Sequence, residues 1–94
     1  MEIEVLQFDK ESKGFFKAVQ GEQEAGRMTY SWAGTDKFII DHTEVSAEFK
    51  GRSVGKKMLM QAVYFAREKQ VSIIPLCPFA KSMFDKLIEI RDVL

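Results

Sequence analysis

Residues 49–57 read FKGRSVGKK, and the hydrophobic period of the chain changes at this point. Before it, apolar side chains alternate with polar ones, most clearly over residues 27–33, and this period of two is typical of a half-buried strand. After it, from Val54 to Ala66, apolar side chains recur at the three- and four-residue spacing of a helix that buries one face. The stretch therefore marks where a sheet ends and a helical part begins.

Four β-rich segments come before this stretch, with short polar turns between them: residues 2–8, 15–19, 27–33 and 37–45. Strands that follow one another through such short connections favour an antiparallel meander. We expect Phe38, Ile40 and His42 to share one face of the last strand, because their positions differ by two.

The second half predicts a helix, a strand and another helix. Ser53 is the expected N-cap of the first helix, because its hydroxyl can accept an N–H of the first turn. Residues 71–77 are interpreted as a buried strand interrupted at Pro75, which has no N–H for the ladder. Pro78 suits the first position of a second helix. The expected buried residues of that helix are Phe79, Ala80, Met83, Phe84, Leu87 and Ile88. The order ββββαβα predicts an α+β fold, with residues 1–94 in one domain.

Length and composition fit an ordinary globular domain with a single core, since the 94 residues are 46% hydrophobic and 30% charged. No apolar run approaches the roughly 20 residues of a membrane-spanning helix, and the acidic start is unlike a signal peptide. The single cysteine cannot form an internal disulfide, so the cytoplasm is the expected compartment. One histidine and one cysteine cannot build a tetrahedral zinc site, and no metal is expected.

Charge is distributed unevenly along the chain. The formal net charge is zero, but residues 1–49 carry five Lys/Arg against ten Asp/Glu, and residues 50–94 carry nine against four. Residues 50–67 contain five basic residues and no acid. This pattern favours an anionic ligand at the basic stretch, or attraction between the two halves, over a general nucleic-acid coat.

The basic stretch has the features of an anion site. The first N–H groups of a helix lack helical partners and carry partial positive charge, and glycines let a phosphate approach the backbone. Two common phosphate motifs do not fit. The P-loop requires glycine at Lys50 and a hydroxyl at Lys57, and the dinucleotide motif requires glycine at Ser53.

Residues 50–55, KGRSVG, resemble the acyl-CoA pyrophosphate loop of the GNAT N-acetyltransferase superfamily, in which Gln or Arg is followed by x-x-Gly-x-Gly/Ala before a helix. Gly55 matches the last glycine, whereas Lys50 and Ser53 depart from the pattern. The flanking residues 42–45, HTEV, and 75–79, PLCPF, are similar to the paired signatures of the short YjdJ-type family of that superfamily.

This resemblance implies a minimal GNAT-like fold with acetyl-CoA as co-substrate. Backbone N–H groups of the loop would hold the pyrophosphate, and its basic side chains would add charge. The strand ending at Val45 would splay from the strand ending at Cys77, with the pantetheine arm between them. The implied acetyl-CoA-binding residues are Thr43, Val45, Lys50, Gly51, Arg52, Ser53, Val54, Gly55, Lys56 and Pro78.

Cys77 and His42 are the implied catalytic residues. In the short family the cysteine is placed beside the thioester, as acyl acceptor or acid, and a following helix N-terminus favours the thiolate. His42 is the candidate general base, because imidazole exchanges protons near neutral pH. Each also has a plainer interpretation: Cys77 as a small buried side chain, and His42 as a hydrogen-bonded core residue.

Larger GNAT enzymes often carry Asn-x-x-Ala-x-x-x-Tyr after the last core strand, and the tyrosine protonates the leaving thiolate. This chain has Cys77, Ala80 and Phe84 at the aligned positions, so that hydroxyl is missing. Two functions therefore stay open: a small N-acetyltransferase acting on an unidentified amine, or a CoA-binding or protein-interaction module without chemistry. No membrane partner is expected, and RNA is disfavoured because the basic stretch lacks interleaved aromatic side chains.

Overall fold

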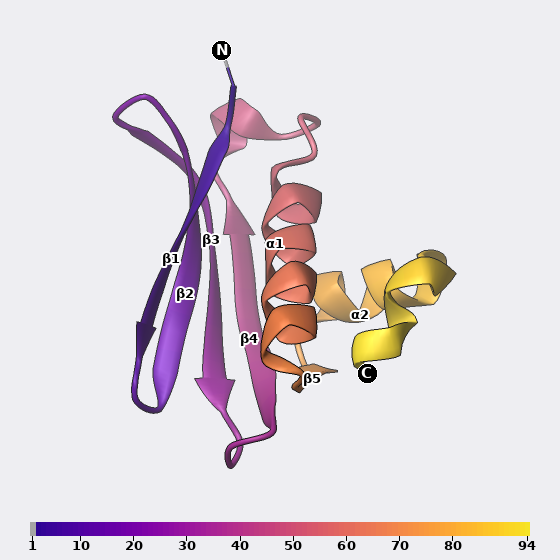
Figure 1. Ribbon diagram of the computed structural model, residues 1–94. Helices are drawn as coiled ribbons and strands as arrows, with labels where there is room; N and C mark the ends of the chain where they lie inside the picture. The colour runs from indigo at the N-terminus through magenta and orange to yellow at the C-terminus, as the bar shows by residue number, and fades with distance from the viewer. Residues whose placement is uncertain (1) are drawn as a thin grey trace.

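The computed structural model describes residues 2–94 and has the predicted α+β architecture (Figure 1). A four-stranded meander is followed by a helix, a fifth strand and a second helix, with two 3₁₀ segments. The bounds are β1 Glu4–Lys10, β2 Lys13–Gln20, β3 Gln23–Trp32, β4 Lys37–Val45, η1 Ala47–Phe49, α1 Val54–Lys69, β5 Ser72–Pro75, α2 Pro78–Lys86 and η2 Ile88–Val93.

The five strands form one sheet in the order β1-β2-β3-β4-β5, so each strand pairs with its neighbour in sequence. Strands β1 to β4 are antiparallel, which confirms the predicted meander. Strand β5 is parallel to β4 and pairs only with its first half, from Lys37 to Ile40. A parallel pair requires a crossover connection, and α1 supplies it.

The helices lie on one face of the sheet, which we call the inner face, and Figure 1 shows the opposite, outer face free of helices within residues 2–94. The core is formed between the inner face and α1. Its fully buried side chains include Phe16, Met28, Tyr30, Phe38 and Ile40 from the sheet and Met58, Leu59, Ala62 and Val63 from α1. These helical residues follow the spacing seen in the sequence, which confirms that α1 is amphipathic.

A β-bulge in β4 changes which of its side chains face the core. The register of β4 against β3 shifts by one residue at Asp41, which has no partner of its own on β3. Phe38 and Ile40 are therefore buried on the inner face, whereas His42 is exposed on the outer face. The prediction that these three side chains share a face was wrong, because the extra residue reverses the alternation.

The start of α1 differs from the predicted cap. Ser53 adopts a left-handed conformation, with φ of 60°, and its hydroxyl makes no capping hydrogen bond. A capping residue normally has an extended backbone, from which its side chain reaches the first turn of the helix. The left-handed backbone of Ser53 differs from that conformation. Ser53 is therefore not the hydroxyl cap that the sequence suggested.

The second helix is shorter than predicted. It ends at Lys86, and the chain turns at Leu87 into η2, which leaves Ile88 73% exposed rather than buried. Arg91 closes this end, because its Nε and Nη2 donate to the carbonyls of Phe84 and Asp85 at 2.7 and 2.6 Å.

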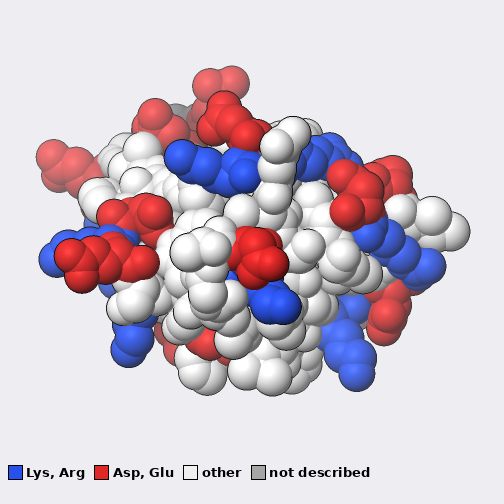
Figure 2. Space-filling view, turned by 60° about the horizontal axis from the view of Figure 1, so that its bottom comes forward, with Lys and Arg blue, Asp and Glu red and all other residues white. Residues whose placement is uncertain are grey.

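The oppositely charged halves of the sequence are not joined by ion pairs within residues 2–94. Lys17 and Arg27 pair with Glu24, and Arg67 pairs with Asp92, so each pair lies within one half. Figure 2, which brings forward the end of the molecule lowest in Figure 1, shows acidic and basic groups interspersed there. The positive charge of the second half is thus left available to solvent and ligands.

Candidate functional site

Helix α1 begins with backbone donors that have no acceptor. The chain enters α1 through two left-handed residues, Gly51 at φ 81° and Ser53 at φ 60°. The first N–H with a helical partner is that of Lys57, which donates to the Ser53 carbonyl at 3.0 Å. Within residues 2–94, the N–H groups of residues 54–56 have no hydrogen-bond acceptor. Free donors at a helix start attract an anion, and a left-handed non-glycine residue is typical of a functional turn.

Basic side chains surround these donors. Lys50, Arg52 and Lys56 are exposed and form no ion pair with the residues that the structure describes. The Arg52 guanidinium lies over the ring of Phe49, 5.1 Å from its centroid, and this contact orients it. A Cβ built on Gly51 would meet nothing within 4 Å, so the turn is open to solvent. The arrangement fits a phosphate or pyrophosphate.

Strands β4 and β5 separate beyond Ile40. The Ile40 carbonyl accepts the N–H of Cys77 at 3.1 Å, and no β4 residue after Ile40 pairs with β5. Strand β4 then continues to Val45, alongside α1 and toward its first turn (Figure 1). The β5-facing edge of this half of β4 is open, so its backbone groups can bind an extended ligand.

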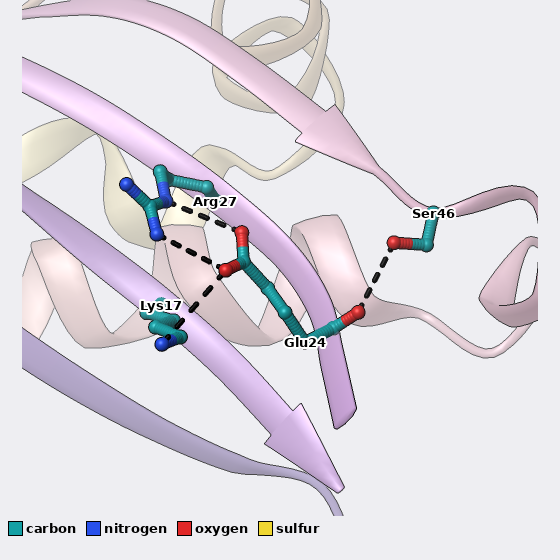
Figure 3. Close-up of polar contacts among 4 residues, drawn as sticks. All are labelled: Lys17, Glu24, Arg27 and Ser46. Atoms are coloured by element: carbon teal, nitrogen blue, oxygen red, sulfur yellow. Dashed lines mark hydrogen bonds and ion pairs between the residues drawn. The ribbon is translucent and has the colours of Figure 1, made fainter. Parts of the chain in front are cut away.

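Polar contacts surround the C-terminal end of β4, which is at Val45 (Figure 3). The Glu24 carboxylate accepts hydrogen bonds from Arg27 at 3.0 and 3.2 Å and lies 3.8 Å from Lys17. Just after β4, the Ser46 hydroxyl donates to the Glu24 carbonyl at 3.1 Å, and the Ser46 N–H donates to the Ala25 carbonyl at 2.8 Å. The two Ser46 contacts set where the chain leaves the sheet, and hence where the basic loop, residues 50–56, lies.

Cys77 lies where β4 and β5 separate, and it is only 5% exposed. Its Sγ lies 3.3 Å from the Thr43 hydroxyl and accepts the N–H of Ala80 at 3.4 Å, which makes Cys77 the N-cap of α2. The structure thus brings together Thr43 and Cys77, which come from the two separate flanking signatures. Cys77 is thus a buried side chain at the point where the two strands part, and its catalytic role stays a prediction.

His42 opens onto a cavity on the outer face. The cavity has a volume of about 1110 Å³, and its wall includes Cys77 and Pro78. The interpretation of His42 as a core residue was wrong, because the bulge at Asp41 turns it outward. The two candidate catalytic residues therefore border one solvent-accessible space.

Gly55 has a packing role that sequence reasoning missed. A Cβ at this position would lie 2.6 Å from Cζ of Phe79, so the ring of Phe79 rests against the first turn of α1. Phe79 belongs to α2, directly after Pro78. Glycine at position 55 thus lets the start of α2 approach the start of α1. This contact keeps Cys77, which caps α2, near the basic loop.

Family membership follows from a comparison with family models. The model described as GCN5-related N-acetyl-transferase matches residues 14–93, most of the chain. The chain belongs to this family.

Solved structures of other acetyltransferases share the fold. A GCN5-like protein from Staphylococcus aureus, assigned as an N-acetyltransferase and solved by NMR, is 36% identical, with 98% of this chain and 85% of that chain covered and a TM-score of 0.70. A ribosomal-protein-alanine N-acetyltransferase from Brucella melitensis is 15% identical, covers 83% and 62%, and has a TM-score of 0.67. No curated protein matches the chain.

A third structure carries a ligand. It is a Bacillus anthracis protein, assigned as a streptothricin acetyltransferase, in complex with acetyl-CoA. This protein is 21% identical, covers 69% of this chain and 38% of its own, and has a TM-score of 0.59. At this identity the likeness shows the fold alone, and this GNAT chain spans well under half of that protein.

Within residues 2–94, no tyrosine occupies the position beside Cys77 that larger GNAT enzymes use. Phe84 occupies the aligned position and is buried. The hydroxyl of Tyr30 is directed toward β1, where it donates to Asp9 at 2.8 Å and accepts from Gln7 at 2.9 Å. Burial raises the pKa of Tyr30 above its usual value; Asp9 raises it further, and Gln7 opposes the shift. Tyr64 is 51% exposed on α1.

Among residues 2–94, no helix has the length and apolar content of a membrane span, and no cluster of three or more His, Cys, Asp or Glu side chains could hold a metal ion.

Proposed function

We propose that this GNAT domain binds acetyl-CoA along the open edge of β4 and transfers its acetyl group to an amine that arrives from the outer face. The observation that carries the proposal is the order of features along β4. Free N–H groups and basic side chains lie at one end, an open strand edge lies in the middle, and Cys77 and His42 lie at the other end.

The pyrophosphate would bind at the start of α1. The N–H groups of residues 54–56 supply unpaired donors, and Lys50, Arg52 and Lys56 supply full positive charges. Hydrogen bonds in which one partner is charged are roughly twice as strong as neutral ones, so this end would contribute most of the affinity.

The pantetheine arm would lie between β4 and α2. Residues 41–45 extend over roughly 13 Å of strand, at about 3.3 Å per residue. Amide groups of an extended arm can pair with an open strand edge as an added strand does. Thr43 and Val45 lie on the inner face of β4, and the Thr43 hydroxyl lies 3.3 Å from the Cys77 Sγ. The thioester would then reach the Thr43–Cys77 contact.

Transfer forms a bond from the amine nitrogen to the thioester carbonyl carbon and breaks the C–S bond. The amine loses a proton and the departing thiolate gains one. His42, exposed on the outer face, would take the proton from the amine, and Cys77 would give one to the thiolate. Proton transfer from His42 to Cys77 then restores both groups. In the alternative route, Cys77 itself attacks the thioester and carries the acetyl group to the amine.

An amide-resolved NMR titration with acetyl-CoA, run in parallel with CoA, tests the binding step. We expect shifts confined to residues 43–57 and 75–82. Lys56→Gln should weaken binding roughly three- to tenfold, since it removes one charge from the pyrophosphate site. Lys69→Gln, at the other end of the same helix, is the matched control. Unperturbed amides at residues 51–56 under millimolar acetyl-CoA would refute the proposal.

Single substitutions test the chemistry. His42→Gln and Cys77→Ser should each lower the rate of acetyl-amine formation by roughly 10²–10⁴-fold, the usual range for losing an acid or base. Serine keeps a polar atom for Thr43 and Ala80, so the fold should survive. Tyr64→Phe, which removes an exposed hydroxyl outside the cavity, is the control. Intact-protein mass measured after acetyl-CoA alone separates the two routes, because only an acyl-enzyme adds an acetyl group to Cys77.

A second function, CoA binding without chemistry, is favoured by the phenylalanine at position 84. If amines are not acetylated although the titration shows binding, the domain is a CoA-binding or protein-interaction module. If the wild type, His42→Gln and Cys77→Ser instead acetylate amines at equal rates, the domain is catalytic but neither residue takes part in the reaction.

We also propose that the chain belongs to the short YjdJ-type subgroup and acts in the cytoplasm. Membership of the short YjdJ-type subgroup is supported by residues 42–45 and 75–79, which lie on either side of the gap. The cytoplasm as compartment is supported by the free thiol of Cys77, since reducing compartments keep such thiols unpaired.

A further inference from the structure

The strand register places side chains in transverse rows on the outer face. One row runs through Phe8, Phe15, Thr29 and His42, each paired with the next across β1 to β4. The row therefore leads from two aromatic rings on the edge of the sheet to the candidate general base. All four residues line the 1110 Å³ cavity.

Large apolar side chains line the cavity from two sides. Phe8 and Phe15 stack with their ring centroids 4.9 Å apart, and Phe8 is 47% exposed. At the opposite side, Leu76 is 67% exposed just before Cys77. Large apolar side chains left in water beside a cavity are typical of a ligand site, because covering them is favourable.

A second row, through Lys10, Lys13 and Ser31, carries two positive charges and is linked to a carboxylate by a hydrogen bond. Lys10 pairs with Lys13, and Lys13 pairs with Ser31. The Ser31 hydroxyl donates to Asp41 at 2.7 Å, which holds that carboxylate on the outer face beside His42. Lys10 and Lys13 have no carboxylate partner within residues 2–94. Two strand spacings, roughly 10 Å, separate β2 from β4.

We propose that this cavity is the acceptor site of the transferase, and that it selects an amine carried on an apolar body that ends in an anionic group about 10 Å away. Asp41 attracts the ammonium end and brings it beside His42. The ammonium releases its first proton to solvent, and His42 takes the second as the amine nitrogen attacks the thioester carbon. The phenylalanine pair covers the apolar body, and Lys10 with Lys13 binds the distal anion. This inference rests on the proposed acetyl transfer.

The same arrangement discriminates against related amines. A diamine places its second cation against Lys10 and Lys13, where like charges repel. An amine with the same chain and no distal charge keeps the apolar contact but loses the attraction to the lysines. The amine with a distal anion, the diamine and the uncharged-tail amine therefore differ only in the group that meets Lys10 and Lys13. Comparing their affinities tests the role of these two lysines directly.

The experiment uses the intact chain with 8-aminooctanoate, octylamine and 1,8-diaminooctane as probes. Each is titrated without acetyl-CoA, with amide and aromatic NMR signals of the two rows as readout. We expect 8-aminooctanoate to bind about tenfold more tightly than diaminooctane, with octylamine between them, and the difference should shrink at high salt.

The double variant Lys10→Glu, Lys13→Glu should reverse that order, because the distal site becomes negative. Lys37→Glu makes the same kind of change on an exposed residue of β4 outside the cavity and should leave the order unchanged. Absence of shifts at Phe15, Thr29 and Asp41 with all three probes would overturn the inference. An order that the double variant does not alter would overturn it as well.

The two proposals fail in different ways. Acetylation of all three amines with equal efficiency would retain the transferase and exclude the selectivity. Preferred binding of 8-aminooctanoate in a chain that does not bind acetyl-CoA would retain the cavity as an amine site and exclude the transferase.

Discussion

Tyr30 connects the core to the edge strand through one hydroxyl. Its ring is buried, and its oxygen contacts Gln7 and Asp9 on β1. Burial, reinforced by Asp9, raises the pKa of Tyr30, so the folded protein keeps the proton at a pH where the unfolded chain releases it. Stability from this residue is therefore complete below about pH 10, the unfolded value, and is lost as the pH rises beyond it.

Tyr30→Phe tests this dependence. Near neutral pH the variant should be about 1 kcal/mol less stable, because two hydrogen bonds are lost. Above about pH 10 the difference in unfolding free energy between wild type and variant should become smaller. A fully enclosed group would lose about 1.4 kcal/mol per pH unit, and we expect a smaller loss because Gln7 and Asp9 are exposed to water. Urea unfolding at several pH values measures this difference. A difference that does not change with pH would contradict the raised pKa of Tyr30.

The packing of Gly55 against Phe79 makes a prediction about two elements. Gly55→Ala should destabilise the fold by roughly 1–3 kcal/mol despite alanine's better helix propensity, because its Cβ meets the Phe79 ring. Adding Phe79→Leu should recover much of that loss, and a double-mutant cycle by urea unfolding measures the coupling.

Gly51→Ala is the control for that cycle. Its φ of 81° strains any other residue, but the space around it is open, so the cost should be about 1 kcal/mol and independent of Phe79. A coupling near zero at Gly55 would mean that α2 does not depend on this contact.

Local patterns were enough to predict most elements, and contacts between elements explain the errors. Alternation and helical spacing depend on neighbours in sequence, so the meander and α1 were predictable. The bulge at Asp41 depends on how β4 pairs with β3, and no spacing rule reveals it. The same applies to the site: Cys77 and the basic loop were found from motifs, whereas Phe15 and Asp41 enter the cavity only through the strand register.

At the scale of the whole molecule, the positive charge of the second half is not neutralised by the acidic half within residues 2–94. The second half of the chain has five more basic than acidic residues, and no ion pair within residues 2–94 links it to the acidic half. Affinity for acetyl-CoA should therefore fall about tenfold between roughly 0.01 M and 0.3 M salt, because screening weakens exposed charges. Calorimetric titration at several salt concentrations measures this slope. An affinity for acetyl-CoA that does not change with salt concentration would mean that its phosphates bind away from the basic loop.

The strand order β1-β2-β3-β4-β5 has a consequence for synthesis. Hairpins close in microseconds, whereas a ribosome adds about 5–20 residues per second. The meander ends at Val45, and α1 is complete only at Lys69. For about a second or more, a nascent chain can thus present Phe16 and Met28 on an uncovered sheet. During that interval the residues of the future core form a surface that a chaperone can hold.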